Sequence, residues 1–220
     1  MSRALVLVGP SAVGKTTVMN ELLSLTDRFL PIRSMTTRPA RSADDTEYLY
    51  VSEQAFAAAA RDGELLEHMT YGTHSYGTPR SELRRVEAEG KCPLLILDLV
   101  GARALKTMLG ETAVHTVYLY DALDVMETRL YARELAHAPS ADALTRFVRR
   151  KEANIRDYLT LCEYAPYLDV LLSNTADAAD VAALVLRSFL TAEITPHDEK
   201  TRVLRLLREM AEKKENYRIG

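Results

Sequence analysis

Cysteine, net positive charge and long apolar runs are all scarce in this sequence of 220 residues. The two cysteines, Cys92 and Cys162, are too few and too far apart to indicate a disulfide framework or a metal site. The formal net charge of −3 gives no overall basic field of the kind that nucleic-acid-binding proteins carry. No apolar stretch approaches the roughly 20 residues that cross a bilayer, and the first apolar run begins directly after Arg3, which leaves no room for a targeting peptide. We therefore expect a cytoplasmic globular protein that binds neither nucleic acid nor membranes.

A complete phosphate-binding loop follows the first apolar run. Residues 4–8 (ALVLV) are short, apolar and mostly branched, as expected of a buried parallel strand. Residues 9–16 (GPSAVGKT) have the loop pattern, and residues 17–23 carry apolar side chains at helical spacing. In the order strand, loop, helix, backbone N–H groups and the positive end of the helix dipole converge on phosphate oxygens. This context predicts a nucleoside triphosphate site; the alternative is a glycine-rich turn that only joins a strand to a helix.

Two loop residues have the side chains that phosphoryl transfer requires. We expect the Lys15 ammonium to reach the β- and γ-phosphates and the Thr16 hydroxyl to ligate Mg²⁺. The predicted ATP-binding residues of this segment are Gly9, Pro10, Ser11, Ala12, Val13, Gly14, Lys15, Thr16 and Thr17.

Three further apolar runs, residues 93–97, 114–120 and 168–172, predict additional strands. Helical segments lie between them, which is typical of an α/β fold with a parallel sheet and helices on both faces. Asp98 closes the first of these runs. An aspartate at the carboxyl end of a strand, beside a phosphate loop, is placed to hold the magnesium shell. A helix cap or a strand-end turn is the alternative for Asp98.

A second anion site is predicted downstream of the loop. Arg38 and Arg41 lie three positions apart, and Pro39 between them keeps the segment out of a helix. Guanidinium groups suit phosphate because they offer paired hydrogen bonds from a permanent charge. Tyr48 and Tyr76 each offer a phenolic donor to the same anion.

With these motifs in this order, the chain resembles the guanylate kinase family, P-loop nucleoside monophosphate kinases that phosphorylate GMP from ATP. The resemblance rests on the loop, residues 34–38 (SMTTR) with Arg41, residues 48–52 (YLYVS), Glu67 and residues 76–78 (YGT). It covers roughly residues 4–190. It implies an α/β fold with a parallel sheet, a small acceptor-binding insertion and a helical lid. It also implies ATP as the donor, Mg²⁺ as the cofactor and GMP as the acceptor.

The resemblance also implies roles for individual residues. Four would hold the GMP phosphate: Arg38, Arg41, Tyr48 and Tyr76. Three would face the guanine: Ser34, Glu67 and Thr78. Three arginines would belong to the lid that closes over the triphosphate: Arg129, Arg133 and Arg146. Asn174 would lie on the ATP side. The catalytic set is then Lys15, Arg38, Arg129, Arg133 and Arg146.

The chemistry of Glu67 supports the acceptor independently. Guanine presents two adjacent donors, N1–H and the exocyclic amine, and an ionised carboxylate accepts both. Adenine lacks this pair, so it would leave a desolvated glutamate unpaired. A solvated helix-end carboxylate is the alternative for Glu67. For Thr78 the alternative is the N-cap of a helix that runs from Pro79 to Gly90.

A basic group at residues 129–150 is expected to act as the lid. The transition state of phosphoryl transfer spreads charge over equatorial oxygens, so positioned cations supply much of the catalysis. Closure of a lid also excludes water. For Arg149 and Arg150 we favour a solvated helix face.

The chain departs from the family pattern on the acceptor and lid sides. Residues 41–48 are shorter than usual and lack a glycine, a second aspartate after Asp98 is missing, and residues 134–142 lack the usual Arg-Gly sequence. Two alternatives to guanylate kinase activity therefore stay open. One is a kinase of the same fold with another acceptor, such as ribose 1,5-bisphosphate, and the other is a non-catalytic guanylate-kinase-like binding module. Arg38 and Glu67 favour a nucleotide acceptor, and Lys15 favours catalysis.

The predicted organisation is one guanylate-kinase-like domain at residues 1–195 and a helical extension at residues 196–220. Within the domain, residues 34–90 would bind the acceptor and residues 129–150 would form the lid. In the extension, Val203, Leu206, Leu207 and Met210 predict an apolar stripe along a helix. We expect a monomer or a homodimer.

Overall fold

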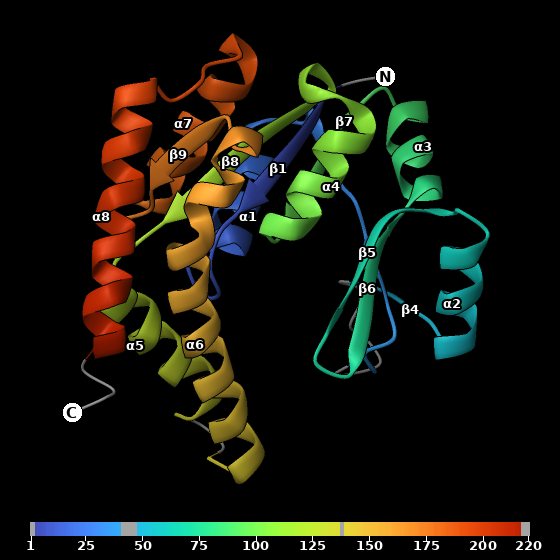
Figure 1. Cartoon of the computed structure of the whole chain (residues 1–220). Helices are drawn as coiled ribbons and strands as arrows, with labels where there is room; N and C mark the ends of the chain where they lie inside the picture. Colours follow the sequence, from blue (N-terminus) through green and yellow to red (C-terminus); the bar gives the residue numbers. More distant parts are fainter. Residues whose placement is uncertain (1–2, 41–47, 137–138, 217–220) are drawn as a thin grey trace.

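A five-stranded sheet forms the centre of the molecule (Figure 1). The computed structural model describes residues 3–40, 48–136 and 139–216. The strand order is β2-β7-β1-β8-β9, and all neighbouring strands are parallel. The strands are β1 (Ala4–Val8), β2 (Phe29–Pro31), β7 (Cys92–Leu97), β8 (Val114–Tyr120) and β9 (Val170–Ser173). The predicted α/β fold with a parallel sheet is therefore confirmed.

Helices cover both faces of this sheet, which explains why its strands are apolar throughout. Helices α1 and α7 pack against each other on one face, α4 and α6 lie together on the other, and α8 packs on α6 (Figure 1). The helices around this sheet are α1 (Lys15–Leu25), α4 (Leu99–Leu109), α5 (Leu123–Glu134), α6 (Ala141–Tyr164), α7 (Ala178–Thr191) and α8 (His197–Asn216). Single 3-10 turns, η1 (Glu111–Ala113) and η2 (Ala165–Tyr167), precede β8 and β9. All five residues of β1 are fully buried, as a strand with both faces covered requires.

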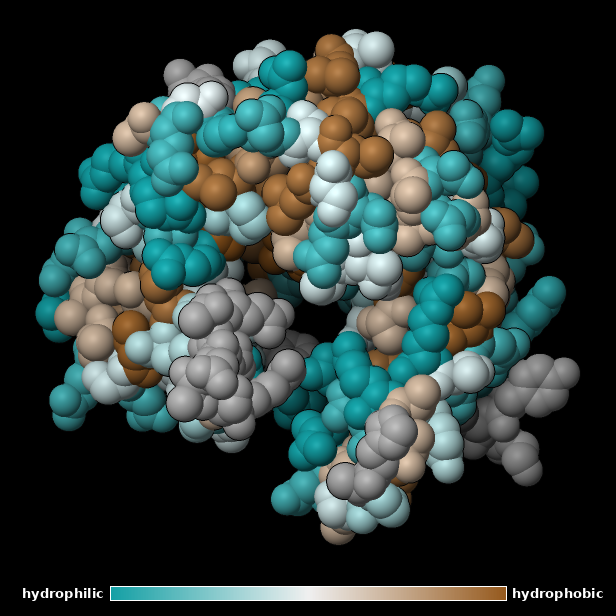
Figure 2. Space-filling model, turned by 180° about the vertical axis from the view of Figure 1, so that it is seen from behind, coloured by the Kyte–Doolittle hydropathy of each residue, from teal (hydrophilic) through white to brown (hydrophobic). Residues whose placement is uncertain are grey.

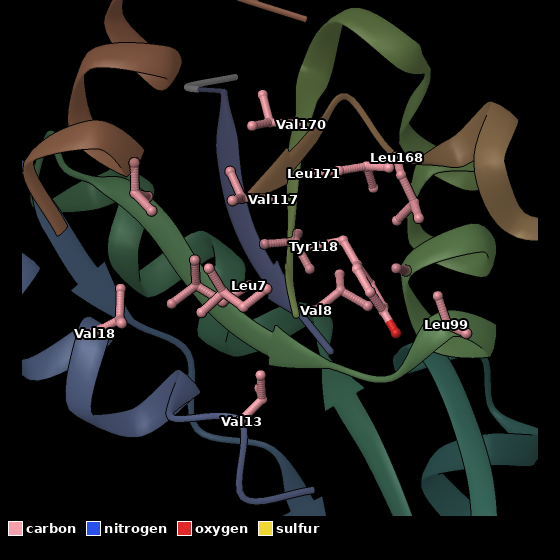
Figure 3. Packing of buried hydrophobic residues seen from close by; sticks show 14 of the residues in the cluster. Leu7, Val8, Val13, Val18, Leu99, Val117, Tyr118, Leu168, Val170 and Leu171 are labelled. Atoms are coloured by element: carbon pink, nitrogen blue, oxygen red, sulfur yellow. The ribbon is translucent and has the colours of Figure 1, made fainter. Parts of the chain in front are cut away.

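The core fixes the end of the sheet from which the phosphate loop leaves. Leu7 and Val8 of β1 pack beside Val117 and Tyr118 of β8 (Figure 3). Val13 of the loop is fully buried and belongs to the same cluster. The loop is therefore anchored in the core by one of its own side chains.

The last strand of the sheet begins later than the apolar run at residues 168–172 indicated. The Asp169 carboxylate accepts the Thr116 N–H at 2.8 Å and pairs with Lys106 Nζ at 2.6 Å. A side chain thus occupies a position that a strand would fill with backbone, and β9 starts at Val170. The runs at residues 4–8 and 114–120 coincide with β1 and β8, and β7 starts one residue before the run at 93–97.

A second, smaller sheet forms from one uninterrupted stretch of chain between β2 and β7 (Figure 1). Its strand order is β4-β3-β6-β5. The elements of this part are β3 (Met35–Thr36), β4 (Leu49–Tyr50), α2 (Glu53–Arg61), β5 (Leu65–Tyr71), β6 (His74–Pro79) and α3 (Arg80–Ala88). A separate small cluster of Phe56, Ala59 and Leu65 holds α2 on the sheet. This sheet falls within residues 34–90, the predicted acceptor region.

The predicted lid, residues 129–150, falls on the end of α5 and the first half of α6, which project from the body of the molecule (Figure 1). The N-terminus of α6 is capped by Ser140, whose hydroxyl accepts the Ala143 N–H at 3.1 Å. This polar cap begins a helix of 24 residues, of which only the second half packs on the core.

The C-terminal segment is helical, but its buried face differs from the predicted stripe. Leu204, Leu207 and Ala211 are buried, whereas Leu206 is 52% exposed. The prediction was wrong at Leu206 because the face toward α6 follows a spacing of three and four residues from Leu204. Among the described helices, none combines the length and the apolarity that crossing a membrane requires.

Candidate functional site

The phosphate loop leaves β1 through three residues with positive φ angles: Gly9 (147°), Ala12 (63°) and Gly14 (106°). A Cβ at Gly9 would lie 2.4 Å from the Leu119 carbonyl oxygen, so this position requires glycine. Ala12 is one of two non-glycine residues with positive φ among the residues that the structure describes. The loop thus holds a backbone conformation that its sequence only partly favours.

Lys15 is folded back over the loop. Its Nζ donates to the Gly9 carbonyl at 2.6 Å and to the Pro10 carbonyl at 2.8 Å. Burial disfavours the charged form and lowers the pKa of Lys15 to about 8. A bound phosphate would reverse this effect, because an anion favours the ammonium.

Ser11 is the point at which the two lid helices contact the loop. The side chain of Asn154 on α6 accepts the Ser11 N–H at 2.7 Å and donates to the Ser11 carbonyl at 2.9 Å. Arg133 of α5 and Arg150 of α6 both donate to the Ser11 hydroxyl, at 3.3 and 3.0 Å. On the opposite side, Asn174 donates to the Val13 carbonyl at 2.5 Å. Side chains from three elements therefore hold this loop.

The lid arginines divide into two groups. Arg129 pairs with Asp121 at 3.0 Å and reaches the Ala12 carbonyl at 3.4 Å, next to the loop. Arg146, in contrast, is half-exposed and pairs with Glu134 at 3.0 Å. It lines neither of the two clefts described below, so the structure does not bring the predicted Arg146 to the site.

Arg150 corrects a second expectation. Instead of lying on a solvated helix face, its guanidinium contacts Ser11 and Glu134 and lines both clefts. The reason is its position along the helix: Arg150 lies one turn after Arg146 and one turn before Asn154, which bonds to Ser11 of the loop. Arg149 is exposed, and its guanidinium lies against Gly72 of the second sheet.

The first cleft, of about 340 Å³, separates the loop from the second sheet. Five predicted acceptor residues line it: Ser34, Arg38, Tyr48, Glu67 and Tyr76. Other lining residues are Lys15, Asp98, Arg150, Asn154 and Asp157. Figure 2, seen from behind, shows the molecule hollowed between its body and two projecting arms. Arg41 lies outside the described residues.

Aromatic side chains hold Arg38 in this cleft. Its guanidinium lies over the Tyr48 ring, 5.3 Å from the centroid, and donates to the Tyr50 hydroxyl at 3.0 Å. Tyr48 in turn packs edge-on against Tyr76, with centroids 5.9 Å apart. The predicted anion-binding residues that the structure describes, Arg38, Tyr48 and Tyr76, therefore form one contiguous cluster.

Glu67 is buried at the end of the same cleft. The Thr78 hydroxyl donates to Glu67 Oε1 at 2.6 Å. The pKa of Glu67 is raised, chiefly by burial and further by nearby Asp98, whereas the hydrogen bond from Thr78 acts in the opposite direction. A second carboxylate oxygen stays available to a ligand, and the alternative of a solvated carboxylate is wrong.

Thr78 itself does not line the cleft, and both roles weighed for it need correction. It is fully buried and orients Glu67 instead of facing a base directly. The N-cap of α3 is Pro79, with no side-chain cap bond. Thr78 lies in the buried end of β6, so its hydroxyl points across the sheet and not along the helix.

Asp98 caps a helix, as the alternative reading proposed. Its Oδ1 accepts the Gly101 N–H at 2.7 Å at the start of α4. Asp98 lines the first cleft, whereas Thr16 lines the second. Among the described residues, no group of three or more His, Cys, Asp or Glu side chains is placed to hold a metal ion. That is compatible with Mg²⁺, which keeps several waters and takes its other ligands from phosphates and one or two protein groups.

The second cleft, of about 590 Å³, lies on the other side of the loop. The predicted donor residues that line it are Ser11, Ala12, Gly14, Lys15, Thr16, Thr17, Arg129, Arg133 and Asn174. Four residues line both clefts: Ser11, Lys15, Tyr48 and Arg150. The two clefts therefore meet at a boundary formed by two cations, a hydroxyl and a phenol.

Sequence reasoning missed Asn154 and Asp157, both on α6. Burial raises the pKa of Asp157 to about 6, and Lys15 and Asp98 are among the charges that act on it. The only signal in the sequence is that both are polar positions directly before an apolar residue, Asn154 before Ile155 and Asp157 before Tyr158. A buried asparagine must find hydrogen-bond partners, but the sequence does not identify them.

Three comparisons place this chain among known proteins. A family model described as guanylate kinase matches residues 1–173. The guanylate kinase of Symbiobacterium thermophilum is 34% identical over 158 residues, which are 71% of this chain and 73% of the relative. That of Thermosynechococcus vestitus is 33% identical over 172 residues, or 77% of this chain and 84% of the relative. The crystal structure of guanylate kinase from Anaplasma phagocytophilum shares the fold, with a TM-score of 0.62, 24% identity and coverage of 90% of this chain and 89% of that one.

Proposed function

The chain belongs to the guanylate kinase family, and from this membership we propose that it transfers the γ-phosphoryl group of ATP to GMP or dGMP. The products are ADP and GDP or dGDP. The observation that carries the proposal is the pair of clefts that meet at Lys15, one bordered by the loop and the lid arginines and the other ending at a buried carboxylate.

The donor side supplies positive charge. The loop amides and the N-terminus of α1 would receive the β-phosphate, and Lys15 would leave its bonds to the loop carbonyls to meet the β- and γ-phosphates. Thr16 would hold Mg²⁺ through its hydroxyl, and Asp98, whose Oδ1 caps α4, would contact the hydration shell of the ion with its other oxygen. The ion would supply positive charge beside the triphosphate.

The acceptor side supplies orientation and selectivity. Arg38, Tyr48 and Tyr76 would bind the GMP phosphate next to Lys15, at the end of the cleft that faces the donor. Glu67 would accept the guanine N1–H and amine, with Thr78 holding its carboxylate in place. A monophosphate dianion is already a nucleophile near neutral pH, so no general base is required.

Arg129, Arg133 and Arg150 would carry the charge that develops during transfer. Each contacts the loop in this structure, and Arg150 stands between donor and acceptor. Arg150 takes the role expected of Arg146, because Arg150 lines both clefts and Arg146 lines neither. ATP and GMP are cytoplasmic metabolites, so we propose the cytoplasm as the site of the reaction.

ADP release from ATP and Mg²⁺, measured with a panel of acceptors, tests the proposal. We expect turnover with GMP and dGMP and background rates with AMP, UMP, dTMP and ribose 1,5-bisphosphate. Turnover with only one of the last four would keep the kinase and replace the acceptor. Binding of ATP without turnover on any acceptor would favour a binding module instead.

The substitution Glu67→Gln tests how the base is read. A glutamine accepts one guanine donor and opposes the other with its own N–H₂, so we expect the KM for GMP to rise about 10- to 100-fold while the KM for ATP stays within about 2-fold. The control is Glu64→Gln, an exposed glutamate directly before β5, the strand that carries Glu67. Equal effects on both KM values, or none, would remove Glu67 from base recognition.

A further inference from the structure

The side chain of Asn154, on α6, bonds to the backbone of the phosphate loop. The side chain is 3% exposed, and both of its polar atoms bond to one residue, Ser11. Its carbonyl takes the Ser11 N–H and its amide nitrogen gives a hydrogen to the Ser11 C=O. The side-chain amide of Asn154 thus makes the same two hydrogen bonds to Ser11 that a backbone amide of a neighbouring strand would make.

The bonded residue precedes the strained point of the loop. Ala12 follows Ser11 and has a φ angle of 63°. Such a conformation persists only where neighbouring contacts over-determine it. The two Asn154 bonds fix the peptide groups on either side of Ser11, immediately before Ala12. They therefore supply one of the constraints that the loop itself lacks.

The contact also sets the distance between the loop and the lid. Asn154 lies one helical turn after Arg150 and one turn before Asp157, and all three side chains line the acceptor cleft. The Ser11 hydroxyl accepts from Arg150 at 3.0 Å. A displacement of Ser11 relative to α6 would thus move Lys15 and Arg150 apart, although both must act on the same phosphoryl group.

We propose that Asn154 is a positioning residue, which holds the backbone of Ser11 so that the phosphate loop and Arg150 keep the relative geometry needed for transfer. This inference rests on the proposed kinase activity and adds a residue to it. In this scheme Asn154 acts through the loop, because its carbonyl oxygen and its amide nitrogen both bond to the Ser11 backbone.

Three variants test the proposal: Asn154→Leu, which keeps the size and removes both bonds; Asn154→Asp, which keeps only the acceptor; and Arg156→Ala, an exposed residue of the same helix, as a control. For Asn154→Leu we expect kcat to fall about 10- to 100-fold, because small misplacements of reacting groups have effects of this size. The KM for GMP should stay within about 2-fold, since Arg38 and Glu67 belong to the second sheet. The kcat of Asn154→Asp should lie between those of wild type and Asn154→Leu, and the kcat of Arg156→Ala should match that of wild type.

Titration calorimetry of ATP binding in the absence of any acceptor separates this inference from the proposed function. We expect a higher Kd for ATP in Asn154→Leu than in wild type, whatever the acceptor is. Wild-type turnover on GMP together with unchanged kcat and ATP affinity in a folded Asn154→Leu would overturn only the role of Asn154. If Asn154→Leu does not fold, Asn154→Asp decides the matter, because wild-type kcat and ATP affinity in that variant would equally overturn the proposal. A rise in the KM for GMP with unchanged kcat would overturn it as well, since it would place Asn154 in acceptor binding.

Discussion

At the scale of single residues, Ala12 is the least expected member of the site. Left-handed backbone is unfavourable for alanine because its Cβ crowds the following carbonyl oxygen. Nevertheless Ala12 has a φ of 63°, and the loop is held by Asn154, Asn174 and Val13 around it. The tertiary contacts of the loop, and not its local preferences, determine this conformation.

Replacing Ala12 by glycine should relieve this strain. We expect Ala12→Gly to raise the free energy of unfolding by about 1 kcal/mol, measured by urea denaturation, because glycine adopts positive φ without a steric penalty. Ala192→Gly is the matched control: Ala192 ends α7 with a φ of 53°, far from the loop, and should gain a similar amount. Unchanged stability in Ala12→Gly alongside a gain in Ala192→Gly would show that the loop is not strained.

The individual site residues differ in how far the sequence could predict them. Lys15, Arg38 and Glu67 belong to local motifs, and the structure brings all three to one cleft. Asn154 and Arg150 could not be predicted in the same way, because which face of α6 meets the loop depends on how the helix packs on the sheet and α8. A run of basic residues along a helix does not by itself indicate which guanidinium points inward.

At the scale of elements, α6 combines two environments along its length. Its first half projects from the body with Arg146 toward Glu134, and its second half is buried at Ile155, Tyr158 and Leu161. Arg150 and Asn154 lie at the transition, where the helix passes the phosphate loop. The functional part of this helix is therefore the single turn between the lid and the core.

Arg150 and Arg146, both on α6, give opposite predictions. We expect Arg150→Ala to lower kcat by at least about 10²-fold, because a cation that stabilises transition-state charge is lost. Arg146→Ala should change kcat by less than about 3-fold, since its partner Glu134 also contacts Arg133 and Arg150. Steady-state kinetics with saturating ATP and GMP measure both. The reverse order of effects would restore Arg146 as the lid arginine.

At the scale of the whole molecule, the C-terminal helix joins the core beyond the region that the family model matches. The match ends at residue 173, whereas α8 packs on α6 through Leu204, Leu207 and Ala211. Near its end, Lys214 pairs with Asp124 and Glu127 of α5. This helix therefore belongs to the same folded unit as the site-bearing helices α5 and α6.

Two leucines of α8 test that integration. Leu207 is buried and Leu206 is exposed, so Leu207→Ala should lower the free energy of unfolding by about 2–5 kcal/mol and Leu206→Ala by less than about 0.5 kcal/mol. Urea denaturation followed by far-UV circular dichroism measures both. We expect one cooperative transition in each case. A separate early transition in Leu207→Ala would show that α8 unfolds independently of the core.

The architecture was predictable from the sequence where strands are buried on both faces. Such strands are continuous apolar runs, and four of the five strands of the central sheet were located in this way. The apolar runs did not predict β2, because it has only three residues. They did not predict the second sheet either, because its strands are short or polar on one face. The strand order was not predictable, because it depends on how each crossover passes the sheet.

The central position of β1 in the sheet has a consequence for folding during synthesis. Residues Ala4–Val8 are synthesised before both neighbours of β1, which are β7 and β8 and begin at Cys92 and Val114. At typical rates of about 5–20 residues per second, the ribosome needs roughly 4 to 20 s to add β7. During that time the most apolar strand of the protein has no partner, and such exposed strands associate readily with other chains. A topology that brings the phosphate loop to one edge of the sheet thus leaves β1 without a neighbouring strand until β7 has been synthesised.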